Sequence, residues 1–123
     1  MPELPPHSPL LDVSDERHGD SLIVRVNGEI DLSTGPPLEQ HLREALESLR
    51  SPNPLVVDLS GVDFLGSYGL ALLLHTHEAA QRKGTPLRIV AAQRAIQRPV
   101  EAVGLRKTLS LHPTVESALG YTG

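Results

Sequence analysis

The chain has no cysteine, which excludes disulfides, thiolate metal sites and thiol nucleophiles. It also lacks tryptophan, and its only aromatic residues are Phe64, Tyr68 and Tyr121. So few rings predict an aliphatic core and leave no stacking platform for single-stranded nucleic acid. A formal net charge of -4 argues against a general nucleic-acid-binding surface, which is normally basic.

Long apolar runs are missing too, since none approaches the roughly 20 residues that span a bilayer. The first nine residues contain four prolines and have neither the basic nor the hydrophobic region of a secretory signal. We therefore expect residues 1–9 to be a disordered tail and residues 10–123 to form one domain of a cytoplasmic protein.

The rest of the sequence alternates between strand and helix patterns. Strands are predicted over 10–17, 21–26, 54–59, 86–91 and 108–111, and helices over 36–50, 69–84, 93–103 and 114–119, with 28–35 as a loop. Leu55, Val56 and Val57 are continuously apolar, which is typical of a strand covered on both faces. The series predicts an α/β fold whose mixed, mostly parallel sheet of about four to five strands is covered by about four helices.

Ser67 lies where the buried strand gives way to a long helix. In the first turn of that helix its hydroxyl would be surrounded by backbone N–H groups that have no partner within the helix. The helix dipole there favours negative charge, so the position suits a phosphate. The local alternative is that Ser67 is only the N-cap. We expect Phe64 to anchor the preceding loop in the core, and Tyr68 to be exposed beside Ser67.

Two motifs resemble those of the STAS domain of anti-sigma factor antagonists, also called anti-anti-sigma factors. Gly28-Glu-Ile-Asp-Leu-Ser-Thr34 matches the family's first motif, and Val56 through Leu70 matches its second. Two positions depart from the second motif, because Gly66 stands where the family usually has Asp and Tyr68 where it has Ser or Thr. The resemblance covers roughly residues 10 to 120 and implies a STAS-like fold.

The resemblance also implies a function centred on Ser67. In the family, the matching serine is phosphorylated by a partner that is both anti-sigma factor and serine kinase. The unphosphorylated protein binds this partner and frees a sigma factor, whereas the phosphorylated protein lets go. A serine phosphatase is then a second partner, and we expect the chain to be a monomer or a weak dimer.

Several further residues are candidates for contact with the partner. The resemblance places the loop of the first motif near Ser67, and it supplies the candidates Asp31, Ser33 and Thr34. The local alternative is that at least one of these three caps the helix that starts at Pro36. Beside Ser67 the candidates are Gly66, Tyr68 and Leu72. For Leu72, burial under the neighbouring helix is an equally good interpretation.

Catalytic and metal-binding interpretations are weaker. His75 and His77 are two residues apart on a helix and point to nearly opposite sides, so they cannot share an ion. Asp58 and Asp63 could hold a cation, but Asp58 more simply ends a strand and accepts hydrogen bonds from loop amides. No phosphate-binding loop or nucleophile elbow occurs.

We therefore expect neither an enzyme nor a metal or cofactor site, and no direct contact with nucleic acid or membrane. Two alternatives to the antagonist role remain. One is a STAS scaffold or ligand-sensing subunit of a larger signalling or transport complex that is never phosphorylated. The other is small-molecule or nucleotide binding in its own right.

Overall fold

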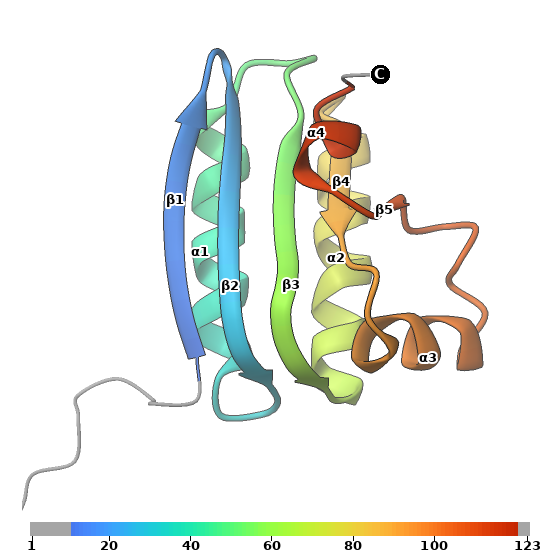
Figure 1. Ribbon diagram of the computed structural model, residues 1–123. Helices are drawn as coiled ribbons and strands as arrows, with labels where there is room; N and C mark the ends of the chain where they lie inside the picture. Colours follow the sequence, from blue (N-terminus) through green and yellow to red (C-terminus); the bar gives the residue numbers. More distant parts are fainter. Residues whose placement is uncertain (1–10, 121–123) are drawn as a thin grey trace, which may run out of the picture.

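The computed structural model describes residues 11–120, in which the chain forms a five-stranded sheet and four helices (Figure 1). The elements are β1 (Leu11–His18), β2 (Ser21–Ile30), α1 (Gly35–Ser48), β3 (Leu55–Leu65), α2 (Ser67–Lys83), β4 (Leu87–Val90), α3 (Arg94–Ala102), β5 (Leu111–His112) and α4 (Val115–Ala118). The strands follow one another across the sheet in chain order; β1 and β2 are antiparallel, and all later pairs are parallel. The predicted α/β class with a mixed, mostly parallel sheet is confirmed. The tail predicted over residues 1–9 lies outside the described residues.

The helices cover the two faces of the sheet unequally. α1 and α2 lie side by side on one face, while the short α4 lies on the other, over β3 and β4 (Figure 1). Leu55 and Val57 belong to the large core under α1 and α2, and Val56 belongs to a smaller cluster with Ala118 of α4. The prediction that this strand is covered on both faces is therefore confirmed. Every buried hydrophobic residue within 11–120 is aliphatic, as expected.

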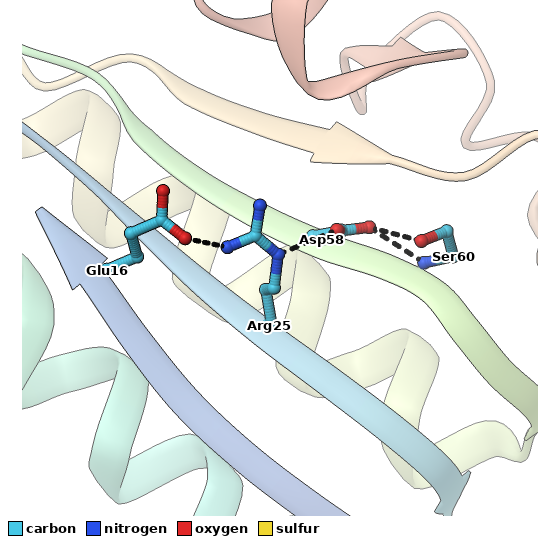
Figure 2. A network of polar contacts seen from close by, with 4 residues as sticks. All are labelled: Glu16, Arg25, Asp58 and Ser60. Carbon is cyan, nitrogen blue, oxygen red and sulfur yellow. Dashed lines mark hydrogen bonds and ion pairs between the residues drawn. The ribbon is translucent and has the colours of Figure 1, made fainter. Parts of the chain in front are cut away.

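Where no helix covers the second face of the sheet, β1, β2 and β3 carry a polar network (Figure 2). Arg25 pairs with Glu16, and its Nε lies 3.6 Å from Oδ2 of Asp58. Asp58 Oδ1 accepts hydrogen bonds from the amide (3.0 Å) and the hydroxyl (2.7 Å) of Ser60. Asp58 is only 8% exposed, so these partners offset the cost of burying its charge.

β2 and β3 run further than the sequence predicts. Residues 28–30 extend β2 instead of starting a loop, and β3 continues past Asp58 to Leu65, so that Glu29 pairs with Phe64 and Ile30 with Leu65. Pairing between the two strands overrides the local turn signals of Gly28 and Gly61. Phe64 is thus a strand residue whose side chain is 49% exposed. The prediction that it anchors the loop in the core is therefore wrong.

None of the helices within the described range is long and apolar enough to span a bilayer.

Candidate functional site

Ser67 is the first residue of α2, and Gly66 is the N-cap. The local interpretation of Ser67 as the N-cap is therefore wrong. Its side chain is exposed and makes no hydrogen bond or ion pair with any other residue that the structure describes. The first helical bond runs from Leu70 N–H to Gly66 O at 3.1 Å, so the amides of residues 67–69 have no carbonyl within the helix. An exposed hydroxyl thus sits at the positive end of the helix dipole, where added negative charge is favoured.

The loop between β2 and α1 is held in shape by its own side chains. Asp31 Oδ1 accepts hydrogen bonds from the Ser33 amide (2.9 Å), the Ser33 hydroxyl (2.8 Å) and the Thr34 amide (3.1 Å). The bond from the Ser33 hydroxyl, followed by those from the two amides, holds the pKa of the Asp31 carboxyl below its ordinary value. Asp31 therefore carries a stable negative charge.

Thr34 is the N-cap residue of α1, but its side chain makes no capping bond. Its hydroxyl instead donates to the Glu29 carbonyl at 2.8 Å and accepts from the Asp31 amide at 2.9 Å. Neither Asp31 nor Ser33 occupies the cap position of α1. The Asp31 side chain nevertheless accepts hydrogen bonds from the free amides of Ser33 and Thr34 in the turn that leads into the helix, so the expected side-chain cap lies just before α1. Thr34 is buried, at 3% exposure, and its hydroxyl bonds hold the loop to the end of β2.

Tyr68 is half-buried, and its ring packs over Gly35 at the start of α1. Its hydroxyl donates a hydrogen bond to Glu39 Oε1 at 2.9 Å. That bond, together with partial burial and the Glu39 charge, raises the pKa of Tyr68 above its ordinary value. Tyr68 thus joins the first turns of α1 and α2, and it is less exposed than expected.

The two motifs meet because β2 and β3 are parallel neighbours and end together. The amide of Gly66 donates to the Ile30 carbonyl at 2.9 Å, which links the end of β2 to the start of α2. An open depression of about 480 Å³ forms there, lined by Asp31, Leu32, Ser33, Phe64, Gly66, Ser67 and Tyr68. The structure therefore brings together the predicted site residues Asp31, Ser33, Gly66, Ser67 and Tyr68.

Leu72 does not take part in this surface. It is 1% exposed and belongs to the core formed with α1 and the sheet, while its neighbour Ala71 faces solvent. Its interpretation as a partner contact is wrong, and the alternative of burial holds. The apolar first turns of α2 are explained by contact with α1 on one side and with the sheet below.

Two apolar residues that the sequence analysis did not select line the same depression. Leu32 is 77% exposed and Phe64 is 49% exposed, and they are two of the three large hydrophobic residues exposed within 11–120. A signal for Leu32 was present, because it is an apolar residue inside a polar loop. The signal for Phe64 was weaker, since it is only one of three aromatic residues in the chain. Exposed apolar side chains gathered beside an exposed hydroxyl are typical of a protein-binding surface.

The electrostatics of the depression are simple. Asp31 is the only charged side chain among the described residues that line it, and no cationic side chain does so. His75 lies outside it, with Nδ1 3.7 Å from Glu39 Oε2. No cluster of three or more His, Cys, Asp or Glu side chains that could hold a metal ion occurs among residues 11–120. The site offers a hydroxyl and an apolar rim for recognition, beside one negative charge.

Known proteins resemble this chain in both sequence and fold. A family model for the STAS domain matches residues 12–118. Anti-sigma-F factor antagonist RsfA of Mycobacterium tuberculosis is 36% identical over 117 residues, covering 95% of this chain and 91% of the relative. Anti-sigma-F factor antagonist RsfB of the same organism is 37% identical over 114 residues, covering 93% and 89%.

A crystal structure of an anti-sigma factor antagonist from Mycobacterium paratuberculosis superimposes with a TM-score of 0.82 at 39% identity, covering 93% of this chain and 96% of that one. The unphosphorylated form of the anti-sigma factor antagonist SpoIIAA superimposes with a TM-score of 0.72 and covers 88% and 93%. At 14% identity, this second likeness concerns the fold alone.

Proposed function

The chain belongs to the STAS domain family, and from this premise we propose that it acts as an anti-sigma factor antagonist switched by phosphorylation of Ser67. The unphosphorylated form binds an anti-sigma factor that is also a serine kinase, and a sigma factor is thereby freed for transcription. Phosphorylation by that kinase ends the complex, and a serine phosphatase restores it. The role belongs to the cytoplasm and requires no catalytic group from this chain.

The observation that carries the proposal is the setting of the Ser67 hydroxyl. It is exposed, it has no hydrogen-bond partner among the described residues, and the apolar side chains of Leu32 and Phe64 lie around it. A phosphoryl acceptor must be accessible, and a protein-binding surface needs apolar area that becomes desolvated. One surface meets both needs, as a partner that is both binding target and kinase requires.

Charge explains why phosphorylation would end binding while leaving the fold intact. A phosphate adds about -1.5 to -2 charges and would lie in the same depression as the ionised Asp31. No cationic side chain among the described lining residues would neutralise it. In the free protein, water and the first-turn amides of α2 solvate the phosphate, whereas an apolar or acidic partner surface would bury it unpaired.

The two departures from the family motif are compatible with this role. Gly66 has φ -83° and ψ -178°, an extended conformation open to any residue, so its backbone does not require glycine. Tyr68 takes the place of a small hydroxyl residue, and its own hydroxyl is engaged by Glu39. Ser67 thus keeps its exposed position although both neighbours differ.

The proposal is tested with the anti-sigma factors of the serine kinase type from the source organism. Each is incubated with ATP and with wild-type, Ser67→Ala or Ser67→Glu protein, and phosphorylation is read by intact mass. Titration calorimetry then gives the affinities. Ser14 supplies a matched control, since its side chain is exposed on β1 and makes no hydrogen bond with a described residue.

We expect Ser67→Ala to bind like the wild type and to resist phosphorylation. Ser67→Glu should lose about tenfold or more in affinity, roughly 1.4 kcal/mol per decade, with little change in melting temperature. Ser14→Glu, which adds the same charge elsewhere, should bind normally. Equal affinities for Ser67→Ala and Ser67→Glu would contradict the switch and favour the scaffold or ligand-sensing role.

A further inference from the structure

Basic residues are concentrated in and just after α3. Residues 94–107 contain Arg94, Arg98, Arg106 and Lys107 against the single acid Glu101, in a chain whose net charge is -4. Arg106 pairs with Glu101. Arg94 and Arg98 are exposed, and neither side chain makes an ion pair or hydrogen bond within residues 11–120. Four residues apart on a helix, they lie on one side, and we call this pair the basic face of α3.

The basic face opposes the local stability of its own helix. Arg94 is the first residue of α3, where the helix dipole disfavours positive charge, and the first turn contains no acid. Two like charges at this spacing also repel each other. The helix is held by other groups: Ile96 and Val100 are fully buried, and Gln97 Nε2 donates to the Ala91 carbonyl at 2.8 Å. A local rule broken without structural gain is expected at functional sites.

The fold also places this face at the same end of the sheet as Ser67. Gln93, immediately before α3, donates from Nε2 to the carbonyls of Leu59 (2.7 Å) and Val62 (2.8 Å) on β3. These bonds hold the start of α3 beside the part of β3 that leads to Phe64 and Ser67. Figure 1 shows α3 at the end of the sheet where α2 begins.

Resting on the function proposed above, we propose that the basic face of α3 is a second contact surface for the same anti-sigma factor, and that it binds acidic side chains of that partner. The guanidinium groups of Arg94 and Arg98 suit carboxylates, which they can bind in a bidentate manner. The surface around Ser67 is apolar with one negative charge, so the two surfaces have different roles in binding. The apolar depression sustains the complex, and the basic face steers its formation.

An acidic partner surface also fits the phosphate switch, because carboxylates near Ser67 would repel a phosphate placed there. A nucleic acid is the less suitable occupant of the basic face. The chain as a whole is negatively charged, and the depression at the same end of the sheet carries Asp31 and no described cation.

The test measures association and dissociation rates for the anti-sigma factor that binds the wild type, from about 0.05 to about 0.5 M salt. The variant is Arg94→Glu with Arg98→Glu, and Arg94→Lys with Arg98→Lys keeps the charge. The matched control is Arg17→Glu with Arg50→Glu. It changes the net charge equally at exposed residues that flank one hollow at the opposite end of the sheet. Circular dichroism confirms that each variant is folded.

Arg94→Glu with Arg98→Glu should raise Kd about tenfold or more at low salt, mainly through slower association, and this loss of affinity should shrink as salt rises. The lysine variant should keep most of the affinity, and the control should bind like the wild type. In contrast, Leu32→Ala should accelerate dissociation at every salt concentration.

Four results would overturn the inference. Equal losses for the basic-face variant and the control would mean that only net charge matters. Normal binding by the basic-face variant, with binding lost in Leu32→Ala, would refute the second surface and leave the proposed function standing. Binding of a labelled DNA duplex that the basic-face variant abolishes would assign the face to nucleic acid. If the wild type binds none of the anti-sigma factors, the proposed function fails and the inference fails with it.

Discussion

Replacing Gly35 by alanine should destabilise the protein mainly through a clash with Tyr68. Gly35 is buried at the start of α1, and a Cβ there would lie 2.3 Å from Cδ1 and 2.5 Å from Cε1 of Tyr68. Both distances are far below van der Waals contact, so the ring must move. The backbone itself tolerates alanine, because Gly35 does not have a positive φ. Most of the cost should therefore come from the clash.

The expected magnitude combines the cost of the clash with the gain in helix propensity. Overpacking of this kind costs about 1–3 kcal/mol. If the ring swings out instead, the loss of its hydrogen bond to Glu39 costs about 1 kcal/mol in addition to the lost packing. Alanine recovers up to about 1 kcal/mol of helix propensity relative to glycine. We therefore expect Gly35→Ala to lower the free energy of unfolding by about 1–2 kcal/mol.

The assay is a double-mutant cycle with Tyr68→Ser, which puts a family-typical residue at position 68 and removes the ring. Urea unfolding followed by far-UV circular dichroism suits a chain without tryptophan. In the serine background Gly35→Ala should be neutral or slightly stabilising, giving a coupling energy of about 1–3 kcal/mol. Tyr68→Phe is the control, because it keeps the ring and should keep the clash. Equal costs in the tyrosine and serine backgrounds would refute the reasoning.

Two further predictions concern the same site. Gly66→Asp should stabilise the protein by a few tenths of a kcal/mol, because aspartate is a good N-cap and the extended backbone accepts it. Its Cβ would lie 3.3 Å from Cε2 of the exposed Phe64 ring, which can turn away. The added acid should also speed phosphorylation of Ser67, read by intact mass; a melting temperature lowered by several degrees would contradict the structural part. Glu39→Gln should bring the pKa of Tyr68 back towards its ordinary value of 10.0, because the Glu39 hydrogen bond and charge raise it. Because the pKa of Tyr68 is higher in the folded than in the unfolded protein, its contribution to stability is fully present below about pH 10 and is lost as pH rises through the folded value. The Glu39→Gln variant should therefore lose less stability at alkaline pH. Near-UV absorbance titration checks this, with Tyr68→Phe to identify the signal, and an unchanged titration would count against the Glu39 contact.

Local pattern was sufficient for most of the elements but failed for several side chains. The apolar run at 55–57 and the helix over 36–50, which buries Leu38, Leu42 and Leu46, were assigned correctly, because burial on one or both faces leaves a periodic trace in the sequence. Leu72 could not be assigned, since the pattern of one helix does not reveal which sides its neighbours cover. Phe64 was misplaced because its strand was predicted to end too early, so its alternation was unknown.

The sequence by itself determined the class of the fold, the position of Ser67 at a strand-to-helix junction, and two motifs typical of STAS domains. Only the tertiary structure decided that these motifs form one surface with Leu32 and Phe64 on its rim. It alone also showed that Tyr68 is held by Gly35 and Glu39, and that the basic face of α3 lies at the same end of the sheet. The physical reason is that helix periodicity and turn chemistry are local, whereas each of these contacts depends on pairing between strands or packing between helices that are distant in the sequence.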